Sequence, residues 1–127
     1  MSVADIPDAD MADNFEPFLP LSRATLHILL ALAGDERHGY AIMQEIARQS
    51  ANRYKLGPGT LYESLQKLLD EGIVVEVSPR AKPVESRRRY YKLTRFGRSL
   101  LSAEISRLES LVHAGKACLA PRPRRAS

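Results

Sequence analysis

The sequence predicts a mainly α-helical domain that carries one β-hairpin and ends in a further helix. Three observations lead to this prediction. Apolar residues recur at helical spacing in four segments, a β-branched run follows the third segment, and a second short strand pattern precedes the fourth. The chain has 127 residues, of which 44% are hydrophobic. That size suits one domain, or one domain with an appendage.

The four helical segments have recognisable starts and ends. They cover about residues 22–33, 39–50, 58–71 and 95–117. Ser22 is placed to cap the first segment, and Gly34 is placed to end it. The second segment carries Tyr40 on its apolar face. Pro58 opens the third, where its missing N–H costs nothing because a first helical turn offers that group no partner.

Two strand patterns lie between the third and fourth helices. Residues 73–77 form the β-branched first strand, residues 78–86 form a polar connection with two prolines, and residues 87–93 form the returning strand. Two helices joined by a short connection and followed directly by a hairpin predict a winged helix-turn-helix. In that fold the third helix lies in the DNA major groove.

Charge is distributed unevenly along the chain, whose net charge is +4. Residues 1–20 hold five acidic and no basic side chains, so residues 21–127 carry 19 basic and ten acidic ones, a net charge of +9. Within residues 80–92 there are six basic side chains and one acidic one. Such a body attracts polyanions, namely nucleic acid or anionic membrane. The alternatives are ordinary solubilising charge and a basic strand edge that prevents aggregation.

Several ordered motifs resemble the PadR family of bacterial transcriptional regulators. The motifs are His38-Gly39-Tyr40, Leu56-Gly57-Pro58-Gly59-Thr60-Leu61-Tyr62, Leu68 with Glu71-Gly72, and Arg87 to Thr94 with Gly97. The resemblance covers about residues 22–112, and the single helix after the hairpin is similar to the small subfamily. It implies a homodimeric repressor that binds an inverted-repeat operator in double-stranded DNA and is released by a small apolar or phenolic effector.

The expected DNA-binding residues come from the second and third helices and the hairpin. They are Tyr40, Gly59, Thr60, Tyr62, Glu63, Gln66, Lys67, Arg80, Lys82, Arg87, Arg88 and Arg89. Glu63 departs from the family pattern, and we expect it to face a cytosine amino group or bulk water. A winged-helix module that binds proteins, without sequence-specific DNA binding, is the alternative function.

The last helix has a broad apolar stripe that predicts a partner helix from a second chain. The expected dimerisation residues are Leu101, Ile105, Leu108, Leu111 and Val112. A fold-back onto the same chain is the alternative. The expected effector-binding residues are Leu30, Phe96 and Leu100. For these three, an ordinary place in the core or the dimer interface is the alternative.

The remaining patterns predict neither catalysis nor a cofactor. Spacings typical of a catalytic triad, a metal site, a P-loop or a dinucleotide motif are absent from the sequence, so we expect no enzyme, no cofactor and no metal. The longest apolar run, six residues, is too short for a membrane span, and the acidic N-terminus does not resemble an export signal, so we expect a cytoplasmic protein. The expected division is an acidic, disordered extension at 1–20, a DNA-binding domain at 21–94, a dimerisation helix at 95–118 and a basic tail at 119–127. Phe15, Phe18 and Leu19 are candidates to dock on the body.

Overall fold

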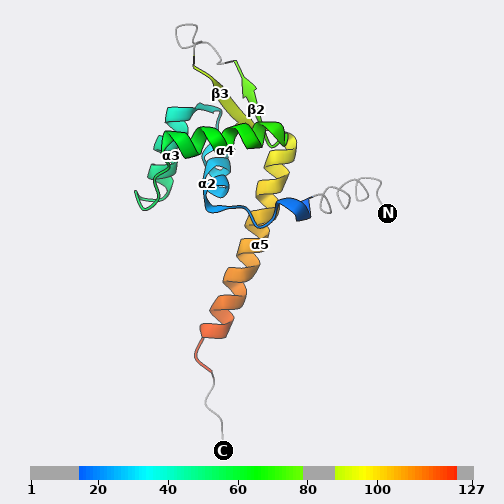
Figure 1. Cartoon of the computed structure of the whole chain (residues 1–127). Helices are drawn as coiled ribbons and strands as arrows, with labels where there is room; N and C mark the ends of the chain where they lie inside the picture. Colours follow the sequence, from blue (N-terminus) through cyan, green and yellow to red (C-terminus); the bar gives the residue numbers. More distant parts are fainter. Residues whose placement is uncertain (1–14, 79–87, 123–127) are drawn as a thin grey trace, which may run out of the picture.

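The computed structural model describes residues 15–78 and 88–122 (Figure 1). The elements are η1 (Glu16–Phe18), α2 (Arg23–Ala33), β1 (Arg37–His38), α3 (Gly39–Gln49), α4 (Pro58–Asp70), β2 (Val74–Val77), β3 (Tyr90–Leu93) and α5 (Arg95–Leu119). Helices α2, α3 and α4 form a bundle. The strands rise from one end of the bundle, and α5 extends beyond the other end as an arm (Figure 1). The predicted fold class, mainly helical with a small antiparallel sheet, is confirmed.

Local sequence signals explain where the helices begin. Three helices start at a side-chain cap, which satisfies a backbone N–H that has no partner in the first turn. The capping atoms Ser22 Oγ, His38 Nδ1 and Thr94 Oγ1 accept hydrogen bonds from the backbone N–H groups of Thr25, Ala41 and Gly97, respectively. Helix α4 instead begins with proline in its first turn, as the sequence predicted.

The sheet has one strand more than the predicted hairpin. Strand β1 pairs antiparallel with β3, with Arg37 opposite Tyr91, so β3 is central in the order β1-β3-β2. The sequence patterns predicted strands only between the third and fourth helices, so β1 was missed. A two-residue strand has no alternation that periodicity could detect, and its existence depends on a pairing with a segment about 50 residues away.

Close contacts join α5 to the sheet. Gly72 ends the α4 region with a positive φ of 74°, which favours glycine. The Thr94 hydroxyl donates to the Gly72 carbonyl oxygen at 2.6 Å, and the Thr94 N–H donates to the Ile73 carbonyl oxygen at 3.1 Å. Gly97 lies so near that a Cβ there would stand 2.0 Å from the same Ile73 oxygen. The first turn of α5 is thus fixed against the start of β2.

The segment before α2 is attached to α5. The expected docking of Phe15 and Phe18 is confirmed, because both rings contact Phe96, with ring centroids 5.6 and 5.5 Å apart. The Leu21 N–H donates to Glu104 Oε2 at 3.0 Å. Glu104 is only 1% exposed, and Arg107 donates to both of its carboxylate oxygens. This buried carboxylate therefore links the N-terminal segment to the arm.

The Glu104 carboxylate makes stability depend on pH. The hydrogen bonds from Arg107, and then that from Leu21, hold its pKa below the ordinary value against the opposing effect of burial. A carboxyl with a lowered folded-state pKa stabilises the fold above its ordinary pKa, near 4.5, and loses this contribution as the pH falls through the folded-state value.

We expect Glu104→Gln to lower the free energy of unfolding by about 1–2 kcal/mol at pH 7. The difference from the unsubstituted protein should shrink steadily below pH 4.5. Urea unfolding at a series of pH values measures it. Glu71→Gln, at an exposed position, is the control and should follow the unsubstituted protein. A difference independent of pH would refute the role of the carboxylate charge.

Candidate nucleic-acid interface

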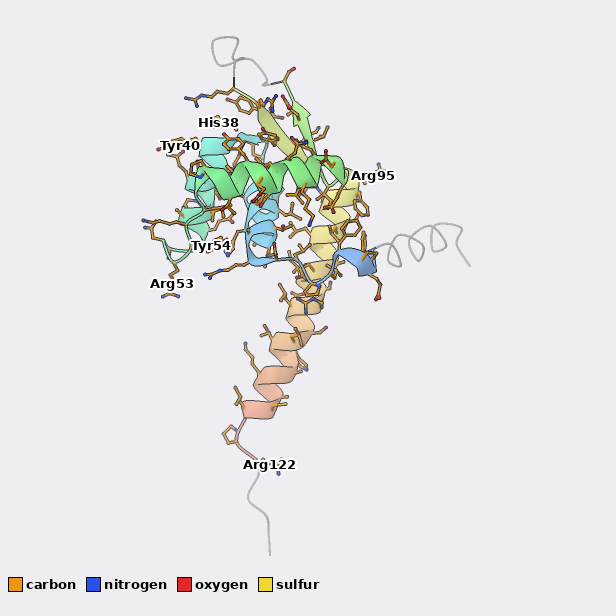
Figure 2. The ribbon with its side chains drawn as sticks, in the orientation of Figure 1. His38, Tyr40, Arg53, Tyr54, Arg95 and Arg122 are labelled. Carbon is orange, nitrogen blue, oxygen red and sulfur yellow. The ribbon has the colours of Figure 1, made fainter. Side chains whose placement is uncertain are left out.

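Aromatic and basic side chains gather where α3 begins, beside α4 and β3. A cavity of about 330 Å³ at this place is lined by His38, Gly39, Tyr40, Tyr62, Arg88 and Arg89. Figure 2 shows His38 and Tyr40 together at the start of α3, on the side of the bundle that carries the strands. Because the N-terminus of a helix and two guanidinium groups face one hollow, the cavity favours an anion.

Gly39 allows the Tyr62 side chain to lie across the start of α3. A Cβ at Gly39 would stand 2.1 Å from the Tyr62 hydroxyl oxygen and 2.7 Å from the adjoining ring carbon. Only glycine leaves room for that hydroxyl. The motif His38-Gly39-Tyr40 and the α4 residue Tyr62 therefore form one site, although more than 20 residues separate them.

Arg88 lies beside His38 at the rim of this cavity. His38 Nδ1 accepts from the Ala41 N–H, so the proton of a neutral imidazole lies on Nε2. Arg88 Nη1 stands 2.8 Å from that Nε2, and both groups are then donors. Within the described residues Arg88 makes no ion pair with an acidic side chain. Arg88 is thus available to an incoming anion. Arg89, by contrast, forms an ion pair with Glu76, with its Nε 3.7 Å from Glu76 Oε2.

Helix α4 presents a separate polar face. Its buried leucines, Leu61, Leu65 and Leu68, lie on one side, and its exposed residues lie on the rest of the surface. The exposed residues predicted to contact DNA are Gly59, Thr60, Tyr62, Glu63, Gln66 and Lys67. Lys67 lies away from Tyr62. It lines a different cavity, of about 370 Å³, with residues of the segment before α2.

The predicted DNA-binding residues are thus brought together in part. The structure joins Tyr40, Tyr62, Arg88 and Arg89 at one cavity, and it exposes the other α4 candidates nearby. Arg80, Lys82 and Arg87 lie outside the described residues. Tyr40 was expected on the apolar face of its helix, and this was wrong because the side chain is 60% exposed. His38 and Gly39 were missed as site residues; their place directly before a predicted helix was the available signal.

The far half of α5 carries an exposed apolar strip. Ile105, Leu108 and Val112 line a shallow hollow of about 350 Å³, together with the polar side chains of Glu109, His113 and Lys116. Val112 and Leu111 are 55% and 56% exposed. Leu101, expected at a dimer interface, is only 4% exposed and belongs to the core of its own chain. The strip therefore begins near Ile105.

The expected effector residues do not line any of the three cavities described here. Leu100 is fully buried in the core, Phe96 contacts Phe15 and Phe18, and Leu30 packs against the core from its edge. Their role stays a prediction. Across residues 15–78 and 88–122, the side chains form no cluster suited to hold a metal ion. In the same ranges, no helix is both long enough and apolar enough to cross a bilayer.

Comparisons with known proteins agree with this geometry. Residues 28–103 match the model of the transcriptional regulator PadR-like family. The transcriptional regulator Rv3488 of Mycobacterium tuberculosis is 38% identical over 87 residues, which are 68% of this chain and 76% of that protein.

Solved structures show the same fold. A PadR family transcription regulator from Clostridium difficile superposes with a TM-score of 0.62 at 23% identity, over 78% of this chain and 100% of that chain. A PadR-like regulator from Bacillus cereus gives a TM-score of 0.64 at 17% identity, over 77% of this chain and 92% of that chain. These likenesses identify the bundle and its strands as a winged helix-turn-helix.

Proposed function

Because the chain belongs to the PadR-like family of transcriptional regulators, which are DNA-binding regulators and not enzymes, we propose that it acts as a homodimeric repressor. The dimer binds an inverted-repeat operator in double-stranded DNA and leaves it when a small apolar or phenolic effector binds. Its place of action is the cytoplasm, where the DNA of a bacterial cell lies.

The cavity at the start of α3, lined by Tyr62, Arg88 and Arg89, is the observation that carries this proposal. A DNA phosphate in this cavity accepts hydrogen bonds from Arg88 and from the Tyr62 hydroxyl, and it faces the positive end of the α3 dipole. Phosphate contacts of this kind fix the position of a protein on the duplex. With the phosphate held there, α4 lies beside it, and its exposed face enters the major groove.

The exposed strip on α5 supports the dimer. A helix that leaves Ile105, Leu108 and Val112 in water gains free energy by burying them against the same strip of a second copy. A twofold pair places two α4 helices on one side of the assembly. The matching DNA site is therefore an inverted repeat.

Selection of bound sequences from random duplexes tests the proposed function. We expect an inverted repeat to be enriched, and we expect Arg88→Ala to weaken binding to all duplexes about equally while reducing the dependence of affinity on salt. Arg122→Ala removes the same charge beyond the end of α5 and is the control (Figure 2). Binding that ignores sequence would contradict an operator-specific repressor and favour the protein-interaction module.

Gly39→Ala should separate DNA binding from folding. The added Cβ displaces the Tyr62 hydroxyl, and this exposed side chain swings away at little cost to the fold. We expect the affinity for the selected operator to fall about tenfold, equivalent to about 1.4 kcal/mol. Fluorescence anisotropy measures the affinity, and thermal unfolding checks the fold. Gly34→Ala, where a Cβ meets nothing within 4 Å, is the matched control. Equal affinities of Gly39→Ala, Gly34→Ala and the unsubstituted protein for the operator would show that Tyr62 does not contact DNA.

A further inference from the structure

We propose that Asp70 sets the base preference of this protein by fixing the side-chain amide of Gln66, so that Gln66 selects adenine in the major groove. The inference rests on the proposed function, in which α4 contacts base edges. Asp70 is a positioning residue in this account, because it acts on Gln66 and need not touch DNA itself.

The geometry of α4 places the two side chains together. Gln66 Nε2 donates to Asp70 Oδ1 at 3.0 Å across one helical turn. Both residues are exposed, and both lie on the side of α4 away from its buried leucines. The hydrogen bond therefore forms on the surface that the proposed function turns towards DNA.

The Asp70 carboxylate determines which way the Gln66 amide points. A carboxylate only accepts hydrogen bonds, so the amide must direct its nitrogen, and not its oxygen, towards Asp70. One N–H is used in this contact. Gln66 then offers DNA one acceptor, Oε1, and one remaining N–H donor, which lie side by side on the amide.

That acceptor and donor pair matches one base in the major groove. Adenine presents a donor at N6 beside an acceptor at N7, which Oε1 and the remaining N–H satisfy together. Guanine presents two acceptors, O6 and N7, and would leave Oε1 facing another acceptor. An amide free of Asp70 could turn its whole NH₂ group towards guanine. The contact with Asp70 therefore discriminates adenine from guanine.

Glu63 strengthens the same preference from the preceding turn of α4. Its exposed carboxylate offers acceptors only, and it makes no hydrogen bond or ion pair with any residue in the described ranges. Glu63 and Asp70 thus surround Gln66 with negative charge, which repels the acceptor atoms of guanine and favours bases that present an amino group. The attraction to phosphate comes from Arg88 and Arg89 at the neighbouring cavity.

The experiment compares base preference in three variants with that of the unsubstituted protein. Selection from random duplexes first identifies the operator. The base pair that Gln66 contacts is then identified as the position at which the Gln66→Ala variant no longer prefers one base over the others. Each of the four bases is placed at that position in turn. We expect the unsubstituted protein to bind adenine there at least about fivefold more tightly than guanine. Asp70→Ala should bring this ratio close to one. Asp70→Asn should keep most of it, because the asparagine oxygen still accepts from Gln66.

Glu71→Gln is the charge control, since it removes one negative charge from the next residue and should leave the ratio unchanged while raising affinity for all duplexes. An unchanged ratio in Asp70→Ala would overturn this inference and leave the proposed function intact. Equal loss of the adenine-to-guanine affinity ratio in Asp70→Ala, Asp70→Asn and Glu71→Gln would show an effect of charge alone and would also overturn the inference. If the unsubstituted protein has no sequence preference, the proposed function fails and the inference fails with it.

Discussion

Leu108→Asp is expected to convert the protein to a monomer and to lower its affinity for a full inverted-repeat operator at least about 100-fold. Leu108 lies between Ile105 and Val112 in the exposed strip on α5. An aspartate placed there in a dimer would be buried without a partner, at a cost of several kcal/mol. Each monomer would then bind only one half-site, without the gain in affinity that the second DNA-binding domain of a dimer provides.

Sedimentation velocity measures the oligomeric state, and anisotropy on the operator measures affinity. Ser110→Asp adds the same charge to the opposite side of α5 and is the matched control. It should remain dimeric and keep its affinity. A Leu108→Asp protein that stays dimeric would place the interface elsewhere and contradict the role given to this strip.

Gly97→Ala is expected to destabilise the fold by about 3 kcal/mol or more, because the added Cβ meets backbone. It would stand 2.0 Å from the Ile73 carbonyl oxygen and 3.0 Å from the carbonyl carbon. Neither atom can move unless α5 separates from the start of β2, which would also lengthen the hydrogen bond from the Thr94 N–H.

Thermal unfolding followed by circular dichroism should show a midpoint lower by about 10 °C or more. Gly115→Ala, in the same helix with nothing within 4 Å of the new Cβ, is the control and should be neutral or slightly stabilising. All proteins are compared at one concentration, because association shifts the midpoint. A midpoint for Gly97→Ala equal to that of the control would show that this close approach is easily relieved.

The sequence predicted the helices closely because their signals are local. The leucines of α4 lie within a few residues of one another, and the cap Ser22 directly precedes α2. The observed helix bounds differ from the predicted ones by at most two residues. Strand β1 was missed because its only support is a pairing with β3. The exposure of Tyr40 and the burial of Leu101 within its own chain were not predictable, because periodicity gives the faces of a helix but does not show which element covers each face.

The candidate site was predictable as a set of residues and not as an arrangement. Helical spacing identified Tyr62 and Gln66 as surface residues of α4, and charge identified Arg88. Tyr62 contacts Gly39, whereas Lys67 lines a different cavity. Both facts depend on how α4 packs across α3, and the spacing of residues in the sequence does not give that packing. The hydrogen bond between Gln66 and Asp70 was open to prediction from their four-residue separation.

The fixed junction between α5 and the sheet has a mechanical consequence. Helix α5 runs as a single helix of 25 residues, Arg95–Leu119, about 37 Å long, and the Gly97 contact lies in its first turn. Because the Gly97 contact and the Thr94 hydrogen bonds hold the first turn of α5 against the start of β2, we expect a tilt imposed at the far end of α5 to move the bundle with it. In a twofold dimer, a small change in the angle between the two α5 helices would produce a larger displacement between the two DNA-binding domains. Major grooves on one side of B-form DNA recur only once per helical turn, so in the proposed dimer we expect this displacement to move one DNA-binding domain out of register with its half-site.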